Sequence, residues 1–395
     1  MKLQGLRVLD LSLFLPGPHL TLMMADHGAE VIKLEPPGGE PVREVGLKQN
    51  GTSVWFRNTH RGKKSICINL KHAAGREALL KIASGCDVVV EAFRPGVARR
   101  LGIDYEAIRE INPGLIYCSI SAFGQDGPLR DRPAHDLAVE ALSGLVACNV
   151  DGQGRPVNPH VPAADMAASL MAFSGILMAL LRRQQTGRGD FIDIAMLDSL
   201  MAWTPNVTGP VFAENRAPHP PHERSFGGNA FYRSYRTKDQ RYIALGGSEH
   251  KFVVNLLSAL GREDLAPLHA QGPGPHQQPL VEFLDQTFAE ESLADWESFL
   301  AEIDVCWAPV LDLHEAFNQP QVRHRRMRWQ DAHGNDHIGI PIRFADEPGD
   351  AKPSVPSLGE HNREVLAACG YSEEDLQELQ SAGVLTGIKA RIPDS

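Results

Sequence analysis

Short apolar runs alternate with segments of helical spacing over the first 125 residues, and this alternation restricts the fold more than any other feature. Buried strands are expected at the apolar runs, residues 6–11, 30–35, 65–70, 86–93 and 115–123. Helices are expected between them, at residues 19–27, 73–84 and 105–112. Strand, helix and strand in succession form a βαβ unit, whose strands lie parallel. The sequence therefore predicts an α/β domain of doubly wound, Rossmann-like topology, with its ligand crevice at the carboxyl ends of the strands.

After residue 134, longer helices are expected. An apolar helix is expected to open at Asp165 and to end before TGRG at 186–189, and a strand follows at 191–197. Residues 215–222, rich in Pro and His, are typical of a linker. Residues 232–245 predict a hairpin with its turn at 238–240, and a final helix is expected at 372–380. With 395 residues, two domains are the natural expectation: a large one beginning at 1–215 and a smaller α+β one at 225–320.

Composition excludes several classes of protein. Hydrophobic residues make up 43% of the chain and charged residues 22%, which is typical of a globular protein. A formal net charge of −10 argues against a nucleic-acid partner. The six cysteines form no CxxC pair, so we expect free thiols and no metal. The N-terminal apolar run is interrupted by Arg7 and Asp10, unlike a signal peptide, and the longest apolar stretch, 166–181, falls short of a membrane span. We therefore expect a cytoplasmic protein without a membrane partner.

Phosphate-binding motifs are absent, but cations follow two predicted strands. Neither GxxxxGK[ST] nor GxGxxG occurs, which argues against an NAD-dependent dehydrogenase. Lysines lie beside the third strand and arginines just past the fourth: Lys63, Lys64, Lys71, Arg94, Arg99 and Arg100. Guanidinium groups suit phosphate, and loops at the carboxyl ends of parallel strands bind ligands. An ordinary solvated basic face explains these positions equally well.

Three titratable residues are candidates for chemistry. His135 lies in a loop that leads into an apolar helix, where a histidine bonded to backbone is the more common case. Asp165 stands at the head of the most apolar helix, and its alternative role is an N-cap. Glu249 follows a Gly pair, and its alternative role is a first-turn helix carboxylate.

Specific motifs along the chain resemble the family III CoA transferases and their relatives, the α-methylacyl-CoA racemases. EAFRPGV at 91–97 and TGRGDFIDIAMLD at 186–198 are the most specific pair, and the segments at 3–39, 58–71, 111–128, 308–322 and 358–361 also match. The similarity covers almost the whole chain in the right order.

The resemblance implies a Rossmann-like large domain and a small domain joined by two linkers, with residues 330–395 returning to the large domain. It also implies a ring-shaped chain in an interlaced homodimer that binds an acyl-CoA substrate, with no cofactor besides the CoA carried by the substrate. The implied CoA contacts are Ile68, Asn69, Lys71, Ala92, Phe93, Arg94, Arg100, Ala134 and Asp136. The position that often carries Arg after KLE is Pro36, so either Arg43 replaces this contact or the contact is absent.

Two activities are compatible with the resemblance. In the transferases the Asp at position 165 attacks the thioester, whereas in the racemases it exchanges the α-proton with a His thirty positions earlier, where His135 stands. Racemases also place a Glu at position 249 to support the His. We therefore predict a buried His135–Asp165 acid/base pair, with backbone N–H groups at the start of the Asp165 helix stabilising the enolate. The alternatives are a CoA transferase with Asp165 as nucleophile, which the segment at 58–66 favours, and a non-catalytic acyl-CoA binding protein.

Overall fold

The computed structural model describes residues 1–387, which form two compact units. The first unit contains Met1–Glu140, Val161–Trp203 and the chain from Phe317 onward. The second contains Ala141–His160 and Thr204–Ala316. Each unit has a hydrophobic core of its own.

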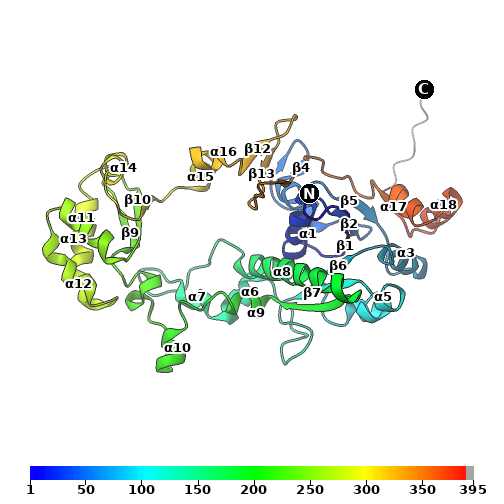
Figure 1. The fold of residues 1–395 in the computed structure, drawn as a ribbon, viewed down its shortest axis with the longest axis horizontal. Coiled ribbons are helices and arrows are strands. Elements are labelled where there is room, and N and C mark those ends of the chain that lie inside the picture. The colour runs from blue at the N-terminus through cyan, green and yellow to red at the C-terminus, as the bar shows by residue number, and fades with distance from the viewer. Residues whose placement is uncertain (388–395) are drawn as a thin grey trace. The chain divides into compact units, whose positions relative to one another are not determined.

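The first unit is built on a six-stranded sheet with the strand order β5-β2-β1-β6-β7-β8 (Figure 1). Its strands are β1 (Arg7–Asp10), β2 (Glu30–Glu35), β5 (Lys64–Cys67), β6 (Val88–Glu91), β7 (Ile116–Ser121) and β8 (Asp190–Ala195). All neighbouring pairs in this sheet are parallel. The chain builds one half of the sheet outward from β1 and then returns to build the other half, which is the Rossmann-like order. The predicted α/β fold with a parallel sheet is confirmed.

Helices cover both faces of this sheet. The core on one face is completed by α3 (Ala73–Ala83), α5 (Tyr105–Ile111), α17 (Asn362–Ala368) and α18 (Glu373–Ser381). The helices α1 (Pro16–Asp26) and α8 (Ala163–Thr186) pack together on the other side of the sheet. Because side chains alternate along a strand, Leu9 and Ile32 point into the first core, while Asp10 and Lys33 point to the face of α1.

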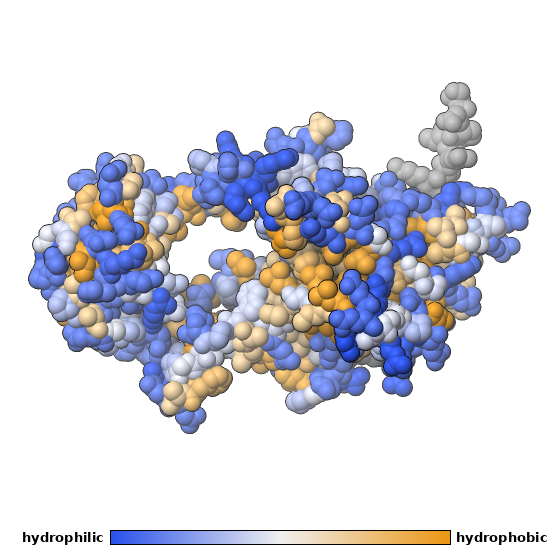
Figure 2. Space-filling view, viewed as in Figure 1, coloured by the Kyte–Doolittle hydropathy of each residue, from blue (hydrophilic) through white to orange (hydrophobic). Residues whose placement is uncertain are grey.

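Helix α8 is longer than the sequence indicated. It has 24 residues and, by length and composition, is the one helix in the described part of the chain that could cross a membrane. It nevertheless packs against α1, β7 and β8, as a core helix does. Its opposite side stays exposed at Leu170, Met171, Met178 and Leu181. Figure 2 shows hydrophobic side chains on the surface of the unit that contains this helix.

The second unit contains a three-stranded antiparallel sheet of order β11-β10-β9. Its strands are β9 (Tyr232–Arg236), β10 (Tyr242–Gly246) and β11 (Trp307–Pro309). The surrounding helices are α11 (His250–Ala259), α12 (Ala266–Ala270), α13 (Gln278–Phe288) and α14 (Leu293–Leu300). The predicted hairpin is confirmed, since β9 and β10 pair directly on either side of Gln240, which has φ of 65°.

The remaining elements are short. The helices are α2 (Val54–His60), α4 (Val97–Leu101), α6 (Asp136–Ser143), α7 (Leu145–Cys148), α9 (Met196–Met201), α10 (Gly209–Glu214), α15 (Leu313–Asn318) and α16 (Pro320–His324). The strands are β3 (Lys48–Gln49), β4 (Thr52–Ser53), β12 (Arg328–Gln330) and β13 (Asp336–Ile338). Helices α2 and α4 were not predicted, and α1 begins at Pro16 rather than at residue 19. Proline is well tolerated at a first helical position, so Pro16 starts the helix instead of excluding it.

Candidate active site

The junction of α6 and α8 holds two of the three predicted chemical residues. Asp136, the first residue of α6, accepts the N–H groups of Ala164 and Asp165 through Oδ1, at 2.9 and 3.0 Å. Glu140, one turn further along α6, accepts the N–H of Ala163 at 2.8 Å. The start of α8 is therefore bonded to carboxylates from α6, and the residue after His135 is tied directly to the backbone of Asp165.

This junction rules out one alternative and corrects one prediction. Asp165 is the third residue of α8 rather than its N-cap, and the N-cap is Pro162. The first N–H groups of α8 already donate to Asp136 and Glu140, so they are not free to stabilise an enolate. Because capping comes from α6, the carboxyl group of Asp165 is left available for chemistry.

The Asp165 carboxyl has an unusual environment. Burial, followed by the charges of Asp136 and Glu140, raises its pKa to about 7. Burial, with Asp136 nearby, also raises the pKa of Glu140. Among the described residues, no hydrogen bond to the Asp165 carboxyl is found, and none joins it to His135. A carboxyl with a pKa near 7 can both accept and donate a proton at neutral pH.

His135 is placed differently from the prediction of a buried pair. It lies at the turn before α6 and is exposed, while Asp165 is half-buried. The imidazole meets the ring of Phe14 edge to face, with the ring centroids 5.9 Å apart and the planes at 83°. The prediction that both members are buried is thus wrong for His135, because the turn before α6 lies at the surface of the unit.

Glu249 belongs to the second unit, whereas His135 and Asp165 belong to the first. It is exposed and stands at the N-cap of α11, where its side chain makes no capping hydrogen bond. The supporting role predicted for Glu249 stays a prediction.

Arginines line a cavity of about 260 Å³ at the carboxyl end of β6. Arg94, Arg99 and Arg130 form part of its wall together with Gly96. Gly96 has φ of 81°, and a side chain there would lie 3.5 Å from Nη1 of Arg100 and 3.7 Å from Nη2 of Arg130. The predicted cations Arg94 and Arg100 thus share one region with Arg130, which was not predicted. Arg130 follows β7 as Arg94 follows β6, so the same strand-end rule applied to the next strand would have identified it.

The other predicted CoA contacts lie after β5, after β6 and at the start of α6. Ile68 is buried in the core, and its N–H donates to the carbonyl of Glu35 at 3.1 Å. The N–H of Asn69 donates to the carbonyl of Val384 at 2.8 Å. The remaining residues are half-buried (Asn69, Ala92, Phe93, Ala134 and Asp136) or exposed (Lys71, Arg94 and Arg100). The strand β5, which precedes Ile68, is separated from β6 by β2 and β1, so the ends of these two strands are not neighbours in the sheet.

Two cations considered for CoA binding, Lys63 and Arg43, are already paired with carboxylates. Lys63 is buried and donates to Asp10 at 3.1 Å and to Thr21 at 2.8 Å. Arg43 donates to both carboxylate oxygens of Glu35, at 2.7 and 2.6 Å. Lys63 is therefore neither a solvated cation nor a free ligand contact, and the pairing of Arg43 with Glu35 favours the interpretation that the contact after KLE is absent.

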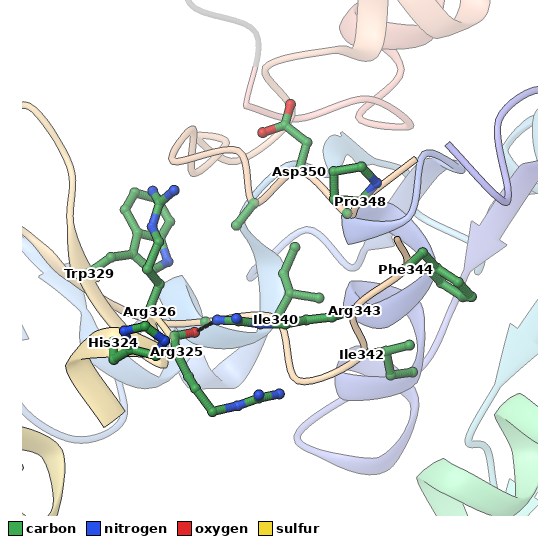
Figure 3. Close-up of a pocket in the computed structure, with 13 residues that line it drawn as sticks. His324, Arg325, Arg326, Trp329, Ile340, Ile342, Arg343, Phe344, Pro348 and Asp350 are labelled. Carbon is green, nitrogen blue, oxygen red and sulfur yellow. Dashed lines mark hydrogen bonds between the residues drawn. The ribbon is translucent and has the colours of Figure 1, made fainter. Parts of the chain in front are cut away.

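A larger cavity, of about 370 Å³, is formed by residues 324–351. Figure 3 shows Arg325, Arg326 and Arg343 around it, with the Arg343 guanidinium bonded to the carbonyl of Arg325. None of the predicted site residues lines this cavity, and we do not assign it to the reaction.

Comparisons with known proteins agree over nearly the whole chain. The sequence model of CoA-transferase family III matches residues 3–362. A succinyl-CoA:glutarate CoA-transferase of Mus musculus is 33% identical, covering 97% of this chain and 90% of the relative. An alpha-methylacyl-CoA racemase of Mus musculus is 30% identical, covering 99% of each. The crystal structure of a CAIB/BAIF family protein from Brucella suis has a TM-score of 0.81 at 29% identity, covering 93% of this chain and 99% of that one.

Proposed function

Because the chain belongs to CoA-transferase family III, we propose that it acts on a 2-methylacyl-CoA and exchanges its α-proton between His135 and Asp165. The observation that carries the proposal is the α6–α8 junction. It ties the residue after His135 to the backbone of Asp165 and leaves the Asp165 carboxyl free, with a pKa of about 7.

The proposed reaction needs one base and one acid. The base removes the proton from the α-carbon, and the electron pair of the C–H bond passes into the thioester to form an enolate. The acid returns a proton to the same carbon from the opposite face, which inverts its configuration. Asp165, with a pKa of about 7, can serve in either state, and imidazole is the other side chain that commonly changes charge near neutral pH. No cofactor besides the CoA carried by the substrate takes part.

We place the phosphate groups of CoA at the arginines around Gly96. Arg94 and Arg130 line the cavity at the carboxyl end of β6, which is where open α/β sheets bind ligands. Guanidinium groups form charge-assisted hydrogen bonds to phosphate oxygens.

The similarity to a succinyl-CoA:glutarate CoA-transferase supports a second candidate function. In this alternative, the Asp165 carboxylate attacks the thioester carbonyl and CoA leaves as the thiolate, which gives an anhydride. The thiolate then attacks the aspartyl carbonyl, releasing the first acid and leaving an aspartyl-CoA thioester. An acceptor carboxylate finally takes the CoA by the reverse steps. His135 would only line the pocket.

Two variants separate the candidates. If the pair exchanges a proton, His135→Ala and Asp165→Asn should each lower α-proton exchange about 10²–10⁴-fold. His333→Ala, an exposed histidine away from the site, serves as the control and should keep full activity. If Asp165 is instead a nucleophile, His135→Ala should retain CoA transfer to an added carboxylate, and hydroxylamine should trap an Asp165 adduct.

We also propose that the protein acts as a homodimer. The side chains of Leu170, Met178 and Leu181 lie on one face of α8 and are 39%, 65% and 64% exposed. Contiguous exposed apolar side chains of this kind mark surfaces that another protein covers. A second copy of the chain would bury this face.

A further inference from the structure

Phe14 has a backbone conformation that is unusual for a residue with a large side chain. It lies in the loop between β1 and α1 and has φ of 65°. This left-handed region is disfavoured for residues that carry a Cβ. Asn and Asp offset part of this cost by hydrogen-bonding to the nearby backbone, which the side chain of Phe cannot do. Such conformations persist where the surrounding structure imposes them, and they concentrate at functional sites.

Buried charges hold this loop in place. The N–H of Phe14 donates to Oε1 of Glu40 at 2.9 Å. Glu40 is buried and lies 3.3 Å from the ammonium group of Lys33, which is itself buried and lies 3.7 Å from Asp10. Both carboxylates in this row of charges, Glu40 and Asp10, are paired with Lys33. A rearrangement of the Phe14 backbone would therefore leave Glu40 without one of its hydrogen-bond donors.

The ring of Phe14 is directed at the candidate active site rather than into the core. It is 37% exposed and meets the imidazole of His135 edge to face. The following helix, α1, is joined to α8 by a contact of 2.9 Å between His19 Nδ1 and Ser169 Oγ. The loop thus brings a third element to the junction that already holds His135 and Asp165.

We infer that Phe14 is a positioning residue, whose constrained backbone holds its ring against His135 and fixes the orientation of the imidazole. An exposed histidine side chain otherwise rotates freely, and proton transfer requires the imidazole nitrogen to lie within hydrogen-bond reach of the α-carbon proton. The inference rests on the proposed function, in which His135 exchanges that proton.

The test is Phe14→Gly, because glycine adopts φ near 65° without a steric penalty. The thermal midpoint of the variant should be unchanged or higher than that of the wild type. The ring is lost, however, so kcat for α-proton exchange should fall about tenfold to a hundredfold, because small misplacements of reacting groups cause rate losses of this size. The KM for the acyl-CoA should change far less than kcat. Phe14→Tyr, which keeps the ring, should restore the rate.

Gln240→Gly is the matched control, since Gln240 also has φ of 65° but lies in the exposed β9–β10 turn. It should match Phe14→Gly in thermal behaviour and keep the wild-type rate. A wild-type kcat in Phe14→Gly, with His135→Ala inactive, would overturn this inference alone. A loss of midpoint and rate together in Phe14→Gly would also overturn it, because Phe14 would then support the fold. Full activity in His135→Ala would overturn the proposed function instead.

Discussion

Asp165 is half-buried and lies beside two other carboxyl groups, Asp136 and Glu140, so ionising its side chain costs free energy in the folded protein. The pKa of Asp165 rises from the ordinary 3.8 to about 7. Between pH 4 and 7, Asp165 is therefore ionised in the unfolded chain but still protonated in the folded protein. As the pH rises through this window, the wild-type protein loses stability that an uncharged residue at this position would retain.

We predict that Asp165→Asn stabilises the fold while it lowers α-proton exchange about 10²–10⁴-fold. One pKa unit corresponds to about 1.4 kcal/mol, and the partial exposure of Asp165 reduces the total, so we expect a gain of about 1–2 kcal/mol above pH 7. Below pH 4 the variant and wild type should be nearly equal. Denaturant titrations at both pH values measure the difference. A variant that is less stable at the higher pH would show that Asp165 is not destabilising.

The cavity lined by Arg94, Arg99 and Arg130 gives a second prediction, about the binding of CoA. Arg94→Gln and Arg130→Gln should each weaken the binding of free CoA about tenfold or more, because a charge-assisted hydrogen bond is worth about 1.5–3 kcal/mol. Titration calorimetry with CoA measures the change. Arg262→Gln removes an arginine from the second unit as a control and should bind CoA as the wild type does. Unaltered affinity in both cavity variants would exclude this site.

The sequence named His135 and Asp165 as candidates but did not predict their surroundings. Their spacing and the family resemblance were sufficient to name them. The exposure of His135 depends on where the turn before α6 lies, and no local pattern encodes that position. The sequence did contain a pattern that indicates the shared role of Asp136 and Glu140, because carboxylates four residues apart lie on one face of a helix.

At the scale of elements, α6 acts as the cap of α8. Asp136→Asn keeps an oxygen that can accept the N–H groups of Ala164 and Asp165 but removes a charge beside the Asp165 carboxyl. It should lower the pKa of Asp165 and move the limb of the pH–rate profile that Asp165 controls to lower pH. Asp131→Asn, an exposed carboxylate in the preceding loop, should leave the profile unmoved. An unshifted limb in Asp136→Asn would contradict the electrostatic account.

Asp136→Ala tests the capping function separately. It removes both acceptor bonds to α8, and losing a helix cap typically costs about 0.5–2 kcal/mol. We expect the alanine variant to be less stable than Asp136→Asn in denaturant titrations. Equal stability of the two variants would show that the bonds from Asp136 contribute nothing to the junction.

The strands were predicted better than the short helices, and the reason is physical. Buried parallel strands are continuous apolar runs, so β2 was predicted with the bounds Glu30–Glu35 that the structure has. Helix α4 has only five residues, between two glycines in left-handed conformation, and its position is set by packing rather than by periodicity.

At the scale of the whole molecule, the exposed face of α8 predicts self-association. A double variant, Met178→Glu with Leu181→Glu, should convert a dimer into a monomer of 43.2 kDa, because charges on an apolar interface cannot be desolvated cheaply. Sedimentation equilibrium measures the mass. Ile111→Glu, at an exposed apolar position of α5, should leave the dimer intact. A wild-type protein that is active as a monomer at assay concentration would contradict the proposal.

The most direct test of the central claim is deuterium incorporation by the wild-type enzyme from D₂O into a single enantiomer of a 2-methylacyl-CoA, with no acceptor acid present. If His135 and Asp165 exchange the α-proton, mass spectrometry should show one deuterium at the α-carbon, and chiral analysis should show the product approaching a racemic mixture. No incorporation, together with rapid movement of CoA when a free carboxylate is added, would contradict the account and establish transfer through Asp165.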